Sequence, residues 1–379
     1  MASSAQAPDG LARFANAFAQ IPHPAPMAAD DRARILANPG FGTAFTDHMV
    51  EIDFDADRGW HDPRVVPYGP IALDPAAAVL HYAQEIFEGL KAYRLGDNAG
   101  ENAGGIALFR PQANAARFNA SARRLAMPEL PADLFVEAVR QQVLADRDWF
   151  PNVDGGSLYL RPFMFASEAF LGVRPARAYK FLVIASPAGN YFKSGAPAVS
   201  IFVSDYTRAA PGGTGAAKCG GNYAASLVPT AEAFARGHDQ VLFLDAAEHR
   251  WIEELGGMNL FFVMADGSIV TPPLAGTILP GITRDSLITL AREEGLTVRE
   301  ERYALDQWRA DAASGALVET FACGTAAVVT PVGKVADTTS EFVIGSGGPG
   351  QLTQRLRQRL VSIQRSEVAD THGWVHRLT

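Results

Sequence analysis

Apolar and polar residues alternate along several stretches of the chain, and this period of two is typical of β-strands. The alternation predicts a hairpin over residues 43–60, with its turn near Asp55 to Gly59. A second hairpin signal is Asp266-Gly267, a pair that favours the tight turns joining antiparallel strands. Further strands are predicted over residues 156–167, 178–188, 198–206, 240–255, 259–273 and 317–332.

Other stretches repeat their apolar residues with the spacing of a helix. The segment 75–89 follows Asp74, a favourable N-cap, opens with Pro75 and closes on Gly89, so we expect one helix there. Further helices are expected over residues 113–126, 132–147, 283–295 and 349–365.

The mixture of helices and strands lacks the regular alternation that builds a parallel sheet, which predicts an α+β fold. A chain of 379 residues is long for one core, so two domains are expected. The predicted parts are an N-terminal arm (1–40), a small N-terminal α/β domain (41–185), a Gly/Pro/Ser-rich interdomain loop (186–195) and a larger C-terminal domain (196–379).

Composition excludes several classes of protein. Apolar residues make up 48% and charged residues 20% of the chain, which indicates a globular protein. The net charge of −8 and the lack of a basic patch argue against nucleic acid as a partner. No apolar run approaches a membrane span, and the N-terminus lacks the pattern of a secretory signal. Two cysteines and eight scattered histidines predict a cytoplasmic protein without a metal site.

Lysine is rare in this chain. The five are Lys91, Lys180, Lys193, Lys218 and Lys334, and the other 28 basic residues are arginines, which cannot act as amine nucleophiles. Lys218 stands in the Gly/Ala-rich stretch TGAAKCGGNYAASL (214–227). On that stretch alone, the lysine also fits a solvated loop charge.

Three familiar motifs do not apply. Lys218 is not part of a Walker A loop, because Ala217 precedes it and Cys219 follows it. The run GSGGPG (345–350) matches a dinucleotide-binding pattern, but it lies too near the C-terminus for a following strand and is interpreted as a turn before the last helix. No nucleophile elbow is present for a Ser/His/Asp site.

Three later segments favour a chemical role for Lys218. Glu254 ends a strand, Gly281-Ile282-Thr283 opens a helix, and Gly324-Thr325-Ala326 interrupts a strand. Each alone also fits a structural role. Together they match the needs of pyridoxal 5'-phosphate, which requires a lysine for the imine, an acid for the pyridine nitrogen and a helix N-terminus for the phosphate.

The order of residues from Glu254 to Arg284, with Gly256, Asn259 and Thr271 between them, resembles the signature of class IV (fold type IV) pyridoxal-phosphate aminotransferases. The segments FTDHM, LHYAQEIFEGLKAYR, LFRPQANAARF, SLYLRPFMF, KCGGNY, QVLFLDA and CGTAAVVTPV narrow the resemblance to branched-chain amino acid aminotransferases. It covers roughly residues 40–365 and implies two domains with the cofactor at their interface.

The resemblance implies roles for the cofactor residues. Lys218 is expected to be the catalytic residue, which binds pyridoxal phosphate as an imine and moves the substrate's Cα proton. Glu254 would pair with the pyridine nitrogen, and Tyr223 would hydrogen-bond the ring oxygen. The phosphate would be held by Arg110, Gly281, Ile282, Thr283 and Thr325.

The resemblance also implies a substrate pocket. Arg161 would meet the second carboxylate of glutamate, and the N–H groups of Thr325 and Ala326 would take the α-carboxylate. The remaining pocket residues are Phe41, Tyr82, Phe87, Tyr159, Tyr191 and Gly257, the last of which is a threonine in some relatives. For Phe41 and Phe87, plain core packing is the alternative. Ala327 and Thr330 stand where some relatives have a redox-active cysteine pair, so no such switch is expected.

The implied function is reversible, ping-pong transamination of L-leucine, L-isoleucine and L-valine with 2-oxoglutarate, by a homodimer or larger homo-oligomer. The alternatives are a D-amino-acid aminotransferase or an aminodeoxychorismate lyase of the same fold, or a non-catalytic regulator that binds pyridoxal phosphate. The sequence does not rank the three amino acids, decide on aromatic substrates or methionine, or separate biosynthesis from degradation.

Overall fold

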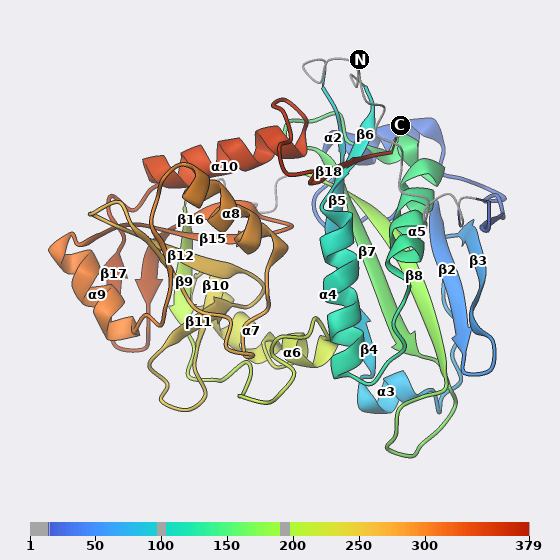
Figure 1. Cartoon of the computed structure of the whole chain (residues 1–379), viewed down its shortest axis with the longest axis horizontal. Helices are drawn as coiled ribbons and strands as arrows, with labels where there is room; N and C mark the ends of the chain where they lie inside the picture. The colour runs from blue at the N-terminus through green and yellow to red at the C-terminus, as the bar shows by residue number, and fades with distance from the viewer. Residues whose placement is uncertain (1–13, 15, 97–103, 190–197, 379) are drawn as a thin grey trace. The chain divides into compact units, whose positions relative to one another are not determined.

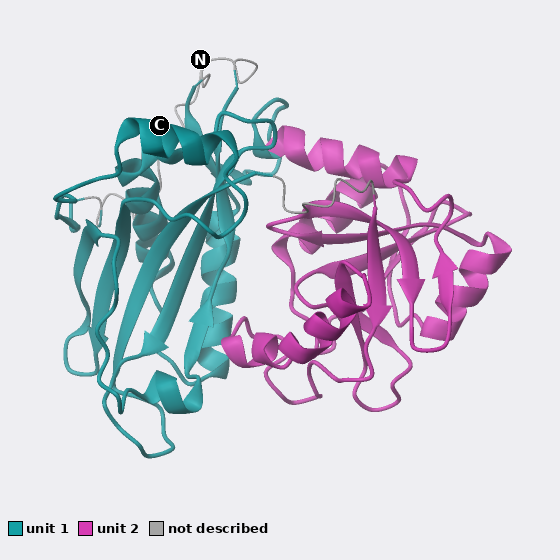
Figure 2. Ribbon diagram, turned by 180° about the vertical axis from the view of Figure 1, so that it is seen from behind, with its two compact units in different colours: residues 1–191, 364–379 teal, residues 192–363 magenta. Residues whose placement is uncertain are grey.

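The computed structural model describes residue 14 and residues 16–96, 104–189 and 198–378. The contacts within the chain divide it into unit 1 (residues 1–191 and 364–379) and unit 2 (residues 192–363), coloured separately in Figure 2. The sequence had placed 364–379 in the C-terminal domain. They join unit 1 because β18 (Val375–Arg377) pairs antiparallel with β6 (Ile106–Phe109).

The described part of unit 1 contains a nine-stranded sheet with the order β1-β3-β2-β8-β7-β5-β6-β18, in which β4 also pairs with β7 (Figure 1). All its pairs are antiparallel except that of β1 with β3. The other strands are β1 (Ala19–Gln20), β2 (His48–Asp55), β3 (Gly59–Pro67), β4 (Glu85–Phe87), β5 (Leu90–Arg94), β7 (Ser157–Ala166) and β8 (Ala178–Ala188).

The predicted hairpin 43–60 is confirmed as β2 and β3, which pair up to Asp55 opposite Gly59. The helices predicted over residues 113–126 and 132–147 are also confirmed, as α4 (Pro111–Arg124) and α5 (Ala132–Ala145). They pack on one face of the sheet through Phe118, Phe135 and Phe181, whose ring centroids lie 5.4–5.9 Å apart. All three rings are fully buried, so this contact forms the centre of the unit 1 core.

The predicted helix 75–89 is wrong. Only α3 (Ala78–Tyr82) is helical; it ends where Ala83 takes a left-handed conformation, and β4 and β5 follow. Asp74 accepts from the Ala76 N–H and forms a turn before the helix rather than its N-cap. The segment is extended because β4 and β5 both pair with β7, which overrides the local helical pattern.

The N-terminal arm is only partly described, since residues 1–13 and 15 lie outside the described residues. Its described part contains β1, which extends the unit 1 sheet beside β3, and α2 (Ala29–Ala37), which buries none of its residues. Of the predicted interdomain loop 186–195, residues 186–188 end β8, and 190–195 lie outside the described residues.

Unit 2 contains a second sheet of nine strands among its described residues, with the order β11-β10-β9-β16-β15-β12-β13-β14 and with β17 paired to β16. The strands are β9 (Val199–Val203), β10 (Gln240–Leu244), β11 (Ile252–Leu255), β12 (Asn259–Met264), β13 (Ile269–Thr271), β14 (Val298–Glu300), β15 (Leu317–Gly324), β16 (Val328–Ala336) and β17 (Glu341–Val343). The predicted turn at Asp266-Gly267 is confirmed between β12 and β13.

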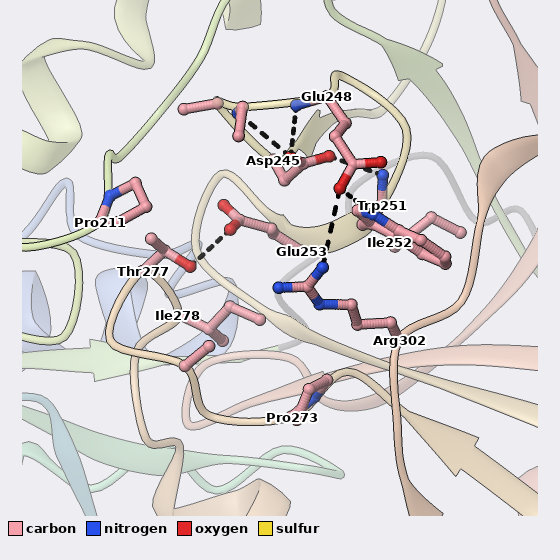
Figure 3. Close-up of a pocket in the computed structure, with 13 residues that line it drawn as sticks. Pro211, Asp245, Glu248, Trp251, Ile252, Glu253, Pro273, Thr277, Ile278 and Arg302 are labelled. Atoms are coloured by element: carbon pink, nitrogen blue, oxygen red, sulfur yellow. Dashed lines mark hydrogen bonds and ion pairs between the residues drawn. The ribbon is translucent and has the colours of Figure 1, made fainter.

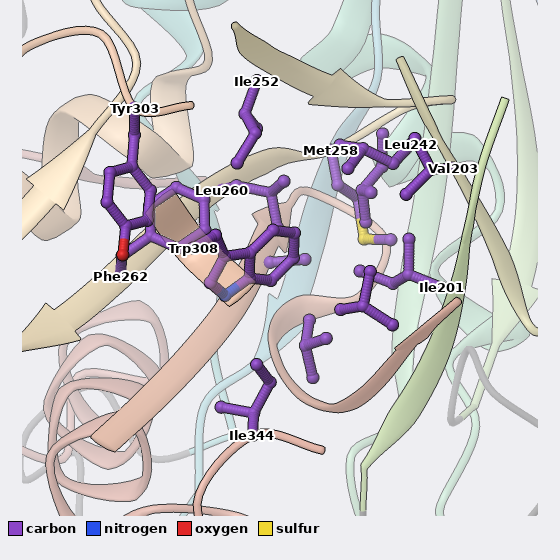
Figure 4. Close-up of a cluster of buried hydrophobic side chains, with 14 of the residues drawn as sticks. Ile201, Val203, Leu242, Ile252, Met258, Leu260, Phe262, Tyr303, Trp308 and Ile344 are labelled. Carbon is purple, nitrogen blue, oxygen red and sulfur yellow. The ribbon is translucent and has the colours of Figure 1, made fainter. Parts of the chain in front are cut away.

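The core of unit 2 forms where α9 covers the sheet. Trp308 of that helix is fully buried and packs edge-on against Phe262 at 5.0 Å, while Tyr303 lies 4.7 Å from Phe262 (Figure 4). The helices of this unit are α6 (Gly220–Ala224), α7 (Leu227–Ala235), α8 (Ile282–Glu293), α9 (Leu305–Ser314) and α10 (Gln351–Gln364). Within the described residues, none of the helices is long and apolar enough to cross a membrane.

The glycine-rich run 345–350 is a turn before α10, as the sequence predicted. The carboxylate of Glu319 accepts from the backbone N–H groups of Leu352 and Thr353, at 3.0 and 2.8 Å. A Cβ on Gly350 would lie 1.9 Å from that carboxylate carbon. The glycines of this run therefore let a carboxylate cap the helix.

Candidate active site

Lys218 lies in the loop before α6 in unit 2. It is half-buried between the buried residues Ala217 and Cys219, and its Nζ donates a 2.9 Å hydrogen bond to the hydroxyl of Tyr223. The single turn of α6 places Tyr223 back beside the lysine five residues earlier. The structure therefore brings together the predicted amine and the predicted phenol.

A network around Asn222 shapes this loop. The Asn222 amide donates to the carbonyl oxygens of Thr214 and Ala217, both at 2.8 Å, and its Oδ1 accepts from the Thr214 hydroxyl. A Cβ on Gly215 would lie 2.5 Å from the Thr277 carbonyl oxygen, so a side chain there would push the loop away. Asn222 was not among the site residues predicted from the sequence. A buried polar residue in a glycine-rich turn was the available signal.

Glu254 is the last acidic residue of β11 and is 3% exposed. Its Oε1 accepts from the backbone N–H of Leu279 at 3.0 Å. Burial raises the pKa of this carboxyl to about 7, and the charges of Arg208 and Lys218 act in the opposite direction. Lys218 therefore lies near enough to this carboxyl to favour its ionised form.

Arg208 is a site residue that sequence reasoning missed. Its guanidinium is buried and forms an ion pair with Glu254, and it also donates to the carbonyl oxygens of Thr277 and Gly215. It lies in an irregular loop after β9, where no residue spacing marks an arginine as functional. Its one available signal was its position ten residues before Lys218.

The predicted phosphate residues of unit 2 stand at the start of α8. Gly281 is the N-cap, and Ile282 and Thr283 form the first turn of this twelve-residue helix. A Cβ on Gly281 would lie 2.1 Å from Oδ1 of Asn259, whose amide donates to the Leu279 carbonyl oxygen at 3.1 Å. Asn259 thus holds the chain in place, and Gly281 at the N-cap supplies no capping side chain of its own.

The turn between β15 and β16 contains Thr325 and Ala326, both half-buried. A Cβ on Gly324 would lie 3.4 Å from the backbone oxygen of Gly257, so this turn runs beside the glycine pair that follows Glu254. A Cβ on Gly257 would have no atom within 4 Å. There is therefore room for a side chain at position 257.

Three of the predicted substrate residues of unit 1, Phe41, Tyr159 and Arg161, line a cavity of about 190 Å³. Phe41 packs edge-on against Tyr159 at 4.9 Å, and Arg161 donates to the Tyr159 hydroxyl at 3.1 Å. The Arg161 guanidinium also lies 4.8 Å from the centre of the Phe87 ring. Tyr159 and Arg161 share one face of β7 because strand side chains repeat every second residue. Phe41 and Phe87 thus pack onto Tyr159 and Arg161.

Of three other residues predicted for the site, Arg110 and Tyr82 are not among the described residues that line this cavity. Arg110, also in unit 1, has a left-handed backbone at the start of α4, and its guanidinium lies 4.8 Å from the ring centre of Trp374. Tyr82 does not line the cavity. It ends α3, is 39% exposed and donates its hydroxyl hydrogen to the Leu171 carbonyl oxygen. Tyr191 lies outside the described residues.

A second cavity, of about 230 Å³, lies in unit 2 and was not foreseen (Figure 3). Glu253 is 7% exposed, and its Oε1 accepts from the Thr277 hydroxyl. Within the described residues its Oε2 has no hydrogen-bond partner, and burial raises its pKa. No group of three or more His, Cys, Asp or Glu in the described parts of the chain is arranged to hold a metal ion.

Comparisons with known proteins identify the family of this chain. Residues 85–335 match the family model of class IV aminotransferases. The chain is 57% identical to a branched-chain-amino-acid aminotransferase of Mycolicibacterium smegmatis over 92% of this chain and 94% of that protein. It is 46% identical to branched-chain-amino-acid aminotransferase 2 of Bacillus subtilis over 88% of this chain and 90% of that protein.

Solved structures show the same fold. The branched-chain amino acid aminotransferase of Escherichia coli superposes with a TM-score of 0.71 at 29% identity, over 87% of this chain and all of that one. The T.th. branched-chain amino acid aminotransferase with pyridoxamine 5'-phosphate gives 0.70 at 30% identity, over 86% and 98%. The fold is therefore α+β of fold type IV. The chain belongs to the class IV aminotransferase family, among relatives that are named branched-chain-amino-acid aminotransferases.

Proposed function

We propose that this chain is a pyridoxal-phosphate-dependent aminotransferase that exchanges an amino group reversibly between L-leucine, L-isoleucine or L-valine and 2-oxoglutarate. The observation that carries the proposal is the grouping of Lys218, Tyr223 and Glu254 within unit 2. The names of the sequence relatives support the substrate class, and pyridoxamine 5'-phosphate in the T.th. structure supports the cofactor.

The residues present suit pyridoxal phosphate. Lys218 supplies a primary amine, and the buried carboxyl of Glu254 suits a protonated pyridine nitrogen, because a buried charge needs a partner. The N-terminus of α8 suits the phosphate, because N–H groups and the helix dipole favour an anion there. Each polar part of the cofactor thus has a chemically matched group.

Each of the three protein residues has a separate role in the proposed reaction. When bound, pyridoxal phosphate supplies an electron sink for the bonding electrons released at the amino acid's Cα. Lys218 takes the Cα proton and returns it, acting as the general base and acid. Tyr223 orients that amine through its 2.9 Å hydrogen bond, and Glu254 holds a proton at the pyridine nitrogen.

The unit 1 cavity suits both kinds of substrate. The rings of Phe41 and Tyr159 offer an apolar wall to a branched side chain. The Arg161 guanidinium in the same cavity offers a charged partner to the second carboxylate of glutamate or 2-oxoglutarate. One pocket can therefore accept an aliphatic and an acidic side chain in turn.

The test is the visible absorbance of the purified protein with pyridoxal phosphate, followed as L-leucine is added without an oxo acid. The expected result is loss of the cofactor's original band with release of 4-methyl-2-oxopentanoate. L-Alanine, which has the same backbone but no branched side chain, is the matched control and should react more slowly. A band that ignores L-leucine would contradict the proposal.

The same measurement separates the alternatives. A D-amino-acid aminotransferase would respond to D-alanine rather than L-leucine, and an aminodeoxychorismate lyase would respond to neither. A non-catalytic regulator would show a bound cofactor band that no amino donor changes. The substrate-class assignment depends on which of these responses occurs.

We also propose that the enzyme is at least a homodimer. Leu80, Leu171 and Val173 are exposed to 58%, 63% and 88%, near the Tyr82–Leu171 hydrogen bond. An exposed apolar cluster of this kind is typical of an interface. Sedimentation should therefore give at least twice the 40.5 kDa chain mass, and Val173→Asp should shift the protein towards monomer. A wild-type monomer at assay concentration would refute this.

A further inference from the structure

Two acids stand next to one another on β11, and in the described part of the chain only one of them forms an ion pair. Glu253 and Glu254 are both buried, and consecutive residues of a strand point to opposite faces. Glu254 forms the ion pair with Arg208, whereas Glu253 accepts from the Thr277 hydroxyl and lines the second cavity (Figure 3). The arrangement distinguishes two otherwise equivalent carboxyl groups.

Arg208 is itself held tightly. Besides Glu254, its Nη2 donates to the carbonyl oxygen of Thr277 at 2.8 Å and to that of Gly215 at 3.3 Å. Gly215 lies three residues before Lys218, and Thr277 lies in the loop that leads to α8. One guanidinium thus joins the acid to the loop of the lysine and to the loop before the helix N-terminus.

The charges around Glu254 give Arg208 a further effect. Burial is the largest influence on the pKa of this carboxyl and favours its neutral form, and the neighbouring Glu253 acts in the same direction. Arg208 favours the ionised form most strongly, followed by the Leu279 N–H, and Lys218 adds a smaller contribution. Removing the arginine charge would therefore leave the acid neutral in the range where an aminotransferase must hold a pyridinium proton.

We propose that Arg208 is a positioning residue that favours the ionised form of Glu254 and directs this carboxyl, and not that of Glu253, at the pyridine nitrogen of the cofactor. This inference rests on the proposed function, since it assigns Glu254 to that nitrogen. Arg208 itself acts through Glu254.

The first experiment needs no cofactor. The infrared band of protonated carboxyl groups is followed against pH in the full-length apoprotein, and the contribution of Glu254 is the part missing in Glu254→Gln. For the wild type we expect its midpoint near pH 7. Arg208→Gln should raise this midpoint by about 1 to 3 pH units, the effect of losing an adjacent opposite charge.

Matched variants make this result decisive. Arg208→Lys keeps the charge and should leave the midpoint within about one pH unit of the wild type. Glu253→Gln removes the acid that lacks the ion pair and should not raise the midpoint. If Arg208→Gln does not fold, Arg208→Met fills similar space without charge and takes its place. A folded, uncharged variant with an unchanged midpoint would overturn the proposal.

The second experiment measures the dissociation constant of pyridoxal phosphate from pH 7 to 9. Arg208→Gln should weaken binding about tenfold or more at pH 7, and the loss should shrink towards pH 9 as Glu254 ionises. A loss that stays the same at every pH would indicate a merely structural role and would overturn the proposal. If the wild type does not bind the cofactor, the proposed function fails, while the infrared result still decides whether Arg208 controls Glu254.

Discussion

The candidate functional residues of the two units are arranged in different ways. In unit 1 Tyr159 and Arg161 are neighbours on one strand face, and together with Phe41 they line part of a cavity. In unit 2 the candidate residues come from loops and strand ends, and buried charges such as Glu254 and Arg208 connect them. The unit 1 residues therefore line a cavity, whereas the unit 2 residues are joined by buried charged groups. Substitutions in the two units should have different consequences.

The largest effect is expected in unit 2, at Lys218. Lys218→Ala should lower kcat by at least about 10²–10⁴-fold, because the amine that moves the Cα proton is lost. Lys218→Arg is the matched control, since it keeps the positive charge without a usable base. Single-turnover kinetics with L-leucine measure both. Near-normal turnover by either variant would remove Lys218 from the chemistry.

The next effect is expected at Glu254. Glu254→Gln should lower kcat by about 10²–10³-fold, the scale of losing one preorganised electrostatic partner, while the affinity for pyridoxal phosphate changes less. Steady-state kinetics and cofactor titration separate the two quantities. A variant that loses affinity but keeps kcat would assign Glu254 to binding alone.

Glu254 should also affect stability without the cofactor. Its pKa is about 7 in the folded chain, against an ordinary value of 4.5, so between these pH values the folded state keeps a proton that the unfolded state has released. The free energy of unfolding therefore falls as pH rises from about 4.5 to 7, by an amount on the order of 3 kcal/mol. Urea unfolding of Glu254→Gln should lack this contribution. Parallel pH profiles for both proteins would contradict it.

A smaller and more selective effect is expected in unit 1. Arg161→Gln should slow the reaction of L-glutamate by about 10- to 100-fold, because a charged hydrogen bond to its second carboxylate is lost. The reaction of L-leucine should change only a few-fold. Measuring kcat/KM for each half-reaction tests this. Equal losses for both amino acids would mean that the unit 1 cavity does not select between side chains.

The smallest effect is expected at Gly257 in unit 2, where there is room for a side chain. Gly257→Thr adds a side chain where a Cβ meets no atom within 4 Å, so the free energy of unfolding should change by less than about 0.5 kcal/mol. The ratio of kcat/KM for leucine to that for valine should shift a few-fold. A loss of kcat as large as that expected for Glu254→Gln would show that there is no room for a side chain at position 257.

Much of the fold could be predicted from local patterns. The hairpin at 43–60, the helices α4 and α5 and the Asp266-Gly267 turn have strong local signals. The structure of the segment after Asp74 could not be predicted in this way, because the pairing of β4 and β5 with β7 overrides its helical pattern. At Gly89, a Cβ would lie 2.2 Å from the Tyr159 hydroxyl oxygen, so this glycine serves a packing contact rather than a helix end.

The candidate site divides in a similar way. Lys218, Tyr223 and Glu254 stand in a recognisable order, and Lys218 and Tyr223 are five residues apart. Asn222 was missed because its amide donates to carbonyl groups, and a backbone acceptor leaves no mark in the residue pattern. Arg208 was missed because its ion-pair partner, Glu254, lies 46 residues away in the chain.

The sequence by itself determined the family, a testable expectation for the chemistry of its rare lysine, and most helices and strands, because these follow from residue types at short spacing. Only the tertiary structure decided which of two adjacent acids is paired, since Glu253 and Glu254 are the same residue type on one strand. Their difference arises from a guanidinium 46 residues away and from the low polarity of the interior, where one charge alters the state of its neighbour.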